Sequence, residues 1–154
     1  MTTIEAVKQA ARSEFNVVKW PLILAFVFFV LASTGVLSHA EGRMFPVVAG
    51  TDITRAVSKV DGIPQIRGQT LFYGHARKLR MCDFDHIEWW IMDKGIASRV
   101  DVVIYERGKI RPTGDFSFGP WGVMLTREEL VEQSWAVTYH RCHPFFLTAT
   151  KFYP

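Results

Sequence analysis

The side chains best suited to chemistry are two cysteines and the histidines near them. Cys82 and Cys142 are the only cysteines of the chain; His86 follows the first, and His140 and His143 lie on either side of the second. Two cysteines in an oxidising compartment usually form a disulfide. Thiolates together with imidazoles also suit zinc or copper. The sequence therefore offers two alternatives, a Cys82–Cys142 bridge or a metal site built from these five residues.

Strand geometry favours the bridge over the metal site. Both cysteines fall in predicted strands, where Cys82 and His86 would share a face but stand about 13 Å apart. His140 and Cys142 would be about 6.5 Å apart, again too far to chelate one ion. Only Cys142 and His143, adjacent at a strand end, converge easily. We therefore expect a disulfide and no cofactor, and keep zinc or copper as the alternative. Such a bridge should stabilise the fold by about 3–4 kcal/mol in the chain-entropy model.

Catalytic chemistry has little support in the sequence. Asp83, Asp85 and Glu88 lie close together, and the first two would stand about 6.6 Å apart on one strand face, a separation seen in glycosidases. Paired acids on an exposed strand are usually only solvated. The sequence contains no Gly-x-Ser-x-Gly elbow, His-Glu-x-x-His motif, phosphate-binding glycine loop or haem-attachment motif. We therefore expect a protein that is not an enzyme.

Aromatic residues suggest binding instead, since they make up 14% of the chain. Successive strand side chains point to opposite faces, so Trp89 and Trp90 cannot both enter one core. The outward indole would then serve a contact, because tryptophan is enriched in binding surfaces. The candidate interface residues are Trp89, Trp90, Trp121, Phe145 and Phe146.

The elements that position these residues look like short strands. Leu79–Met92 alternates clearly, and Thr126 with Glu129 forms a capping box that opens one short helix, Arg127–Gln133. Further strands are predicted at Thr70–Tyr73, Val100–Tyr105, Phe116–Leu125, Trp135–Cys142 and Phe145–Phe152. Residues 69–154 are thus predicted to form a mainly β domain, a small antiparallel β-sandwich of immunoglobulin-like or related type, with an α+β domain as the alternative. Residues 39–68 are expected to be linker and loops, with one short strand near Ile53–Val60.

The cysteine and tryptophan layout resembles the cysteine–tryptophan–cysteine core of immunoglobulin-like domains. The spacing departs from that pattern, because Trp89 follows Cys82 too soon and Tyr139 lies three rather than two residues before Cys142. The likeness supports a disulfide-linked sandwich and not membership of that family.

Ahead of this domain, residues 20–38 form a run of nineteen without a charged side chain. As one helix the run would span roughly 28 Å, close to the thickness of a bilayer core, so we expect a single transmembrane helix. A cleaved signal ending at Ser38-His39-Ala40 is the rival interpretation. Residues 1–19 are expected to be an amphipathic leader, with Lys19 and Trp20 at the membrane interface.

The basic flank of this run predicts its orientation. Lys8, Arg12 and Lys19 precede it, so the amino terminus should be cytoplasmic and the β-domain periplasmic, at a bacterial inner membrane. A net charge of +3 gives no nucleic-acid signature. The local basic group His75, Arg77, Lys78 and Arg80 is expected at a solvated strand edge.

These features together favour a non-enzymatic accessory or scaffold subunit. Its partners would be the lipid bilayer and an integral membrane or envelope protein complex. A periplasmic zinc or copper assembly factor is one alternative, and a phage or mobile-element envelope protein is another.

Overall fold

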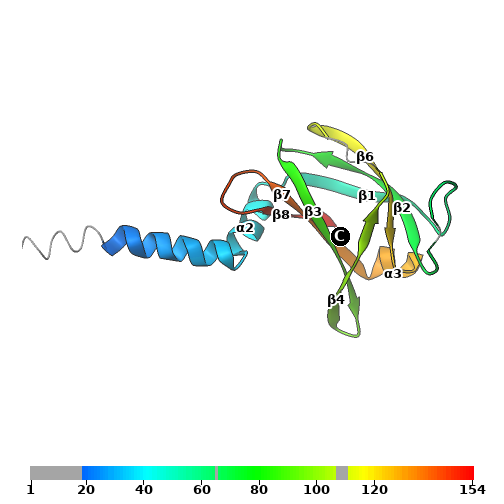
Figure 1. Ribbon diagram of the computed structural model, residues 1–154, viewed down its shortest axis with the longest axis horizontal. Coiled ribbons are helices and arrows are strands. Elements are labelled where there is room, and N and C mark those ends of the chain that lie inside the picture. The colour runs from blue at the N-terminus through cyan, green and yellow to red at the C-terminus, as the bar shows by residue number, and fades with distance from the viewer. Residues whose placement is uncertain (1–18, 65, 107–110) are drawn as a thin grey trace, which may run out of the picture. The chain divides into compact units, whose positions relative to one another are not determined.

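The computed structural model describes residues 19–64, 66–106 and 111–154 (Figure 1). It divides into two compact units, residues 1–37 and residues 38–154. The expected leader, residues 1–19, lies outside the described residues except for Lys19. The elements are a helix Lys19–Ser33, α2 (Val36–Met44), β1 (Val48–Val57), β2 (Thr70–Lys78), β3 (Asp83–Asp93), β4 (Ile96–Val100), β5 (Val102–Ile104), β6 (Gly114–Val123), α3 (Arg127–Glu132), β7 (Ser134–Arg141) and β8 (Thr148–Tyr153).

The apolar run is not one continuous helix, which corrects the prediction for residues 20–38. The first helix ends at Ser33, and α2 begins at Val36. The Thr34 hydroxyl donates to the carbonyl of Val30, and Gly35 takes a φ of +76° that ends a helix readily. In the part of the chain that the structure describes, no single helix is long and apolar enough to cross a membrane. Helix Lys19–Ser33 and α2 meet that criterion only together, as a bent pair.

Residues 38–154 form two four-stranded antiparallel sheets, ordered β1-β2-β6-β5 and β4-β3-β7-β8 (Figure 1). Asp101 alone separates β4 from β5, so the chain passes from one sheet to the other there. At the opposite edges β1 lies beside β8. This confirms the mainly β, sandwich-like domain, and the capping box of Thr126 and Glu129 opens α3 as predicted.

The range 39–68 is more structured than the sequence suggested. Most of α2 and all ten residues of β1 fall within it. The segment was predicted to be mainly loops because glycine and proline residues recur along it. The pairing of β1 with β2 supplies the order, because the strand satisfies its backbone hydrogen bonds against a partner that lies later in the chain.

The core between the sheets is aromatic. Trp89 is fully buried, its ring centroid lies 5.0 Å from that of Phe72, and its indole N–H donates to the Ser134 hydroxyl at 2.9 Å. Phe118, Trp121, Phe152 and Tyr153 complete the cluster. Burial of so much aromatic area supplies most of the driving force for folding of this domain.

The predicted disulfide is confirmed. Cys82 and Cys142 are bonded, and their Cα atoms are 4.6 Å apart. The β3–β7 ladder pairs Asp83 with Arg141, so the bridge joins the next two positions of neighbouring strands. It therefore lies within one sheet, whereas the immunoglobulin bridge connects two sheets.

Candidate functional site

The five residues of the alternative metal site do not come together. The two sulfur atoms are bonded to each other, so neither is a thiolate. His86 stacks on Tyr139, with ring centroids 4.4 Å apart, whereas His140 is buried between the sheets and His143 bonds to Glu41. Among the described residues, no group of three or more histidine, cysteine, aspartate or glutamate side chains is placed to hold a metal ion.

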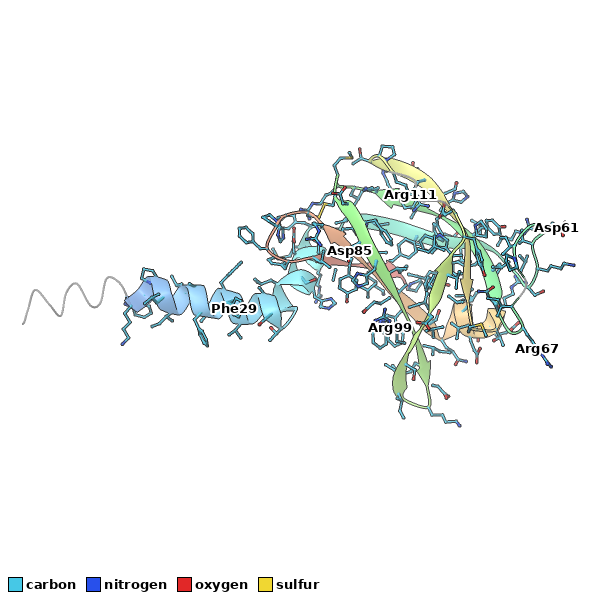
Figure 2. All side chains as sticks on the ribbon, in the orientation of Figure 1. Phe29, Asp61, Arg67, Asp85, Arg99 and Arg111 are labelled. Atoms are coloured by element: carbon cyan, nitrogen blue, oxygen red, sulfur yellow. A yellow bond between two sulfur atoms is a disulfide. The ribbon has the colours of Figure 1, made fainter. Side chains whose placement is uncertain are left out.

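Two of the three acids of β3, Asp85 and Glu88, make surface ion pairs. Asp85 accepts from His86 at 2.7 Å and from Arg141 at 3.4 Å, and the hydrogen bond from His86 is the main reason that the pKa of Asp85 is lowered. Glu88 accepts from Arg99 at 3.0 Å. Asp85 and Arg99 are labelled on this sheet in Figure 2. A register shift between Phe84 and His86 interrupts the alternation that would have put Asp83 and Asp85 on one face.

The tryptophans separate into core and surface positions. Trp89 and Trp121 belong to the core rather than to a contact surface, because they are 0% and 2% exposed. Trp90 is half-buried on the opposite face of β3, and its ring is parallel to that of Trp135, with centroids 6.5 Å apart. The pair comes from directly opposed positions of β3 and β7.

A second aromatic pair lies on the same outer face, at His86 and Tyr139. The Tyr139 hydroxyl donates to Glu88 at 3.1 Å, and burial together with that carboxylate raises the pKa of the phenol. We call His86, Trp90, Trp135 and Tyr139 the outer aromatic face. All four are half-buried rather than covered, so their rings remain partly accessible on the sheet surface.

A network around Glu41 attaches α2 to the β-domain. The two oxygens of Glu41 accept from Arg80 at 3.0 Å, from His143 at 3.0 Å and from the Thr148 hydroxyl at 2.7 Å. Burial alone would raise the pKa of Glu41, but the hydrogen bonds from Thr148, His143 and Arg80 outweigh it and the pKa is lowered. Gly42 packs directly against the carbonyl of Ala149, where a Cβ would clash.

Exposed apolar side chains surround this Glu41 network. Arg80 donates to the carbonyl of Phe45 at 2.9 Å, and the ring of Phe145, which is 73% exposed, lies 6.0 Å from that of His143. The ring of Phe146 meets the same imidazole edge to face, with ring centroids 4.1 Å apart. We call the exposed members of this group the apolar rim: Met44, Phe45, Leu79, Met81 and Phe145.

The first helix carries the two residues expected at a membrane interface. Lys19 and Trp20 begin its described part, and both side chains are exposed. The apolar side chains that follow project from the helix without covering neighbours, and Phe29 is 70% exposed (Figure 2).

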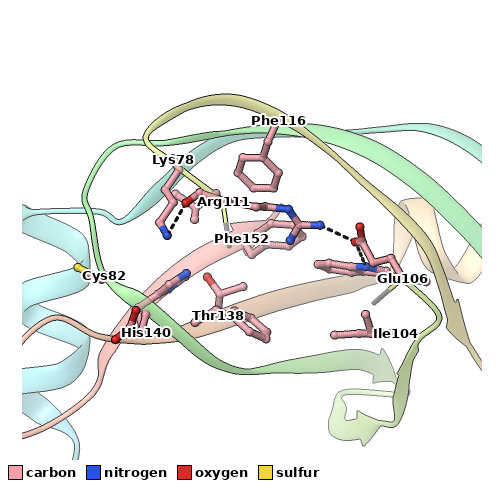
Figure 3. Close-up of a pocket in the computed structure, with 13 residues that line it drawn as sticks. Lys78, Cys82, Ile104, Glu106, Arg111, Phe116, Thr138, His140 and Phe152 are labelled. Carbon is pink, nitrogen blue, oxygen red and sulfur yellow. Dashed lines mark hydrogen bonds and ion pairs between the residues drawn. The ribbon is translucent and has the colours of Figure 1, made fainter. Parts of the chain in front are cut away.

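A cavity of about 550 Å³ lies between the two sheets and opens to the surface beside the exposed residues Phe84 and Ile104 (Figure 3). Its apolar wall comes mainly from Val48, Ile104, Phe116, Trp121 and Phe152, and its polar lining from Lys78, Asp83, Glu106, Arg111, Thr138 and His140. A volume of this size with mostly apolar walls and a few convergent polar groups is typical of small-molecule sites.

Glu106, at one side of this cavity, is held through one of its two carboxylate oxygens. Its Oε1 accepts from the Trp121 indole at 2.7 Å, from the Gly119 N–H at 3.1 Å and from Arg111. Burial would raise the pKa of this carboxyl, but these three hydrogen bonds outweigh it and the pKa is lowered. The Arg111 guanidinium also lies 4.8 Å from the centroid of the Phe116 ring.

Lys78 and His140 form the other side of the cavity. Each is the last of the buried, inward-facing side chains along its strand, Lys78 on β2 and His140 on β7. Figure 3 shows their nitrogens turned toward each other. Lys78 donates to the carbonyl of Arg111 at 2.9 Å. Burial lowers the pKa of Lys78 below its usual value, and burial together with the Lys78 charge lowers that of His140 to about 4.

Sequence reasoning placed Lys78 in a solvated basic group, and this is corrected. His75 and Arg77 are exposed, but Lys78 is 9% exposed because it shares the inward parity of Phe72 and Ala76. The same parity would have placed His140 inside with Ala136 and Thr138. The roles of Glu41 and Glu106 could not be predicted from the sequence, because the partners that hold them come from other elements of the fold.

No protein-family model, no curated protein and no solved structure matches the chain.

Proposed function

We propose that the chain is a non-enzymatic binding protein held at a membrane by its apolar helix. Residues 38–154 would serve as an accessory domain on the periplasmic side of a bacterial inner membrane, bound to a larger integral membrane protein. The observation that carries the proposal is the outer aromatic face, where two aromatic pairs lie partly open on the paired strands β3 and β7. Rigid aromatic anchors of this kind are typical of binding hot spots.

The Glu41 network supports close tethering to the bilayer. Only Thr34 and Gly35 separate the first helix from α2, and the network fixes α2 to the β-domain. A domain attached this closely stays near the membrane surface, which favours a partner embedded in the same bilayer over a freely diffusing one.

The apolar rim supports the same proposal. Met44, Phe45 and Phe145 are exposed at the end of the domain where α2 enters. Exposed apolar side chains next to the charged groups of Arg80, Glu41 and His143 suit the boundary between lipid headgroups and acyl chains. The disulfide is consistent with an oxidising compartment such as the periplasm.

The proposal is tested by solubilising membranes in a mild detergent and analysing the protein by native sizing and mass spectrometry. We expect the wild type to run with companion membrane proteins and the double variant Trp90→Ala/Trp135→Ala to run alone. Arg77→Ala is the matched control, because this exposed side chain lies on the outer face of the other sheet. A wild type that runs as a lone monomer, or a double variant that keeps its companions, contradicts the proposal.

A further inference from the structure

We propose that the cavity between the two sheets binds an aliphatic monocarboxylate, with its head group between Lys78 and His140 and its chain along the apolar wall. This site is separate from the outer aromatic face. It would give the domain a small-molecule function that does not depend on a protein partner.

The positive charge of Lys78 would be stabilised by a bound anion. Lys78 as a residue is 9% exposed, its ammonium hydrogen bond is partly buried, and among the described residues it makes no ion pair within 4.0 Å. Its one hydrogen bond, to the carbonyl of Arg111, leaves two N–H groups of the ammonium to be satisfied. A buried cation without a carboxylate is costly, so a ligand that brings the negative charge is favoured at this point.

The other charged groups of the cavity do not fill that role. Glu106 is already bound by Arg111, Trp121 and the Gly119 N–H. Asp83 acts on Lys78 only through its charge, and its side chain is exposed. Among the described residues of the lining, Lys78 is therefore the one cation without an ion-pair partner, which favours a monoanion over a phosphate monoester.

His140 supplies a second contact for the head group. It is 3% exposed, and its Nδ1 is buried with no hydrogen-bond partner among the residues that the structure describes. With a pKa of about 4 the imidazole is neutral at pH 7, so one ring nitrogen carries a proton and can donate it to a carboxylate oxygen. Two donors on facing strands fit the two oxygens of one carboxylate.

The apolar wall fixes the chemistry of the remainder of the ligand. Phe116, Phe152, Ile104 and Val48 line it. At roughly 30 Å³ for each water-sized group, a cavity of about 550 Å³ has room for about 18 non-hydrogen atoms. A twelve-carbon carboxylate such as laurate fits within this limit, whereas a two-chain phospholipid does not.

The test uses the full chain in phosphatidylcholine nanodiscs and laurate labelled with ¹³C at the carboxyl. Empty nanodiscs report laurate that dissolves in lipid, so a separate, saturable carboxyl resonance reports laurate bound to protein. We expect about one laurate bound per chain. Dodecanol, which keeps the chain but lacks the charge, should compete about ten- to a hundredfold more weakly. Absence of a saturable protein-bound resonance, or equal competition by dodecanol, overturns the proposal.

Substitutions locate the site. Lys78→Met should weaken laurate binding about ten- to a hundredfold, whereas the matched control Lys151→Met, an exposed position on β8, should not change it. The apo Lys78→Met variant should melt no lower than wild type, because the substitution removes a buried charge. Ile104→Trp, at a half-exposed position of the apolar wall, tests the chain pocket independently and should weaken binding at least tenfold. Wild-type affinity in either cavity variant overturns the assignment.

Discussion

The paired indoles Trp89 and Trp90 give a sharp test of the fold, because adjacent residues of the same type should respond very differently. Trp89→Ala removes a fully buried ring that packs on Phe72 and Tyr153, and it leaves the Ser134 hydroxyl without its donor. Core Trp→Ala changes cost about 3–5 kcal/mol. Trp90→Ala removes a half-buried ring and its stack on Trp135, at a cost of about 1 kcal/mol.

These costs translate into clearly separated melting temperatures. For a domain of this size 1 kcal/mol corresponds to about 3–6 °C, so Trp89→Ala should melt at least 10 °C lower and Trp90→Ala only a few degrees lower. The assay is thermal unfolding of the full chain followed by near-ultraviolet circular dichroism. A free-thiol count is the control, because it shows whether the Cys82–Cys142 bridge is intact in both variants. Similar large losses for both variants would refute the assignment of Trp90 to the surface.

Two further predictions concern the attachment of α2 and the disulfide. Because the pKa of Glu41 is lowered in the folded state, its contribution to the free energy of unfolding is complete above about pH 4.5 and is lost as pH falls through the folded value. In urea unfolding, Glu41→Gln should therefore be less stable than wild type at pH 7, and the difference in the free energy of unfolding should shrink below pH 4.5. The exposed control Glu132→Gln should leave the dependence of stability on pH unchanged. A difference between Glu41→Gln and wild type that does not depend on pH contradicts this prediction. Cys82→Ser/Cys142→Ser opens a loop with a sequence separation of 60 residues and should cost about 4 kcal/mol, measured by the same unfolding curves. A loss below 1 kcal/mol would show that the unfolded chain is already compact between these positions.

Local chemistry in the sequence was enough to predict several features of this protein. Thr126 and Glu129 satisfy each other's backbone donors within one turn, so the start of α3 could be read directly. The alternation in Leu79–Met92 predicted a strand where the structure has β3, since side-chain parity is a property of the strand itself. The pairing of Cys82 with Cys142 was predicted because each had only one possible cysteine partner and because strand spacing disfavoured the alternative metal site.

Other features depended on segments far apart in the chain, and only the tertiary structure decided them. The strand β1 is ordered by β2, and α2 is held by Arg80, His143 and Thr148, so residues 39–68 looked like loops in isolation. Parity placed Trp89 and Trp90 on opposite faces, but it could not say which ring faced the core. That choice depends on where the second sheet packs.

The cavity is the clearest case of a feature that the tertiary structure decided and the sequence alone did not. In sequence, Lys78 belonged to a basic group and His140 to a cluster beside a cysteine. In the structure they face each other from different sheets, and their burial follows from the register of β2 with β6 and of β7 with β3. The sequence by itself determined which residues alternate and which cysteines bond. The packing of the two sheets determined which alternating row is inside, because burial is a property of two surfaces in contact and not of either strand alone.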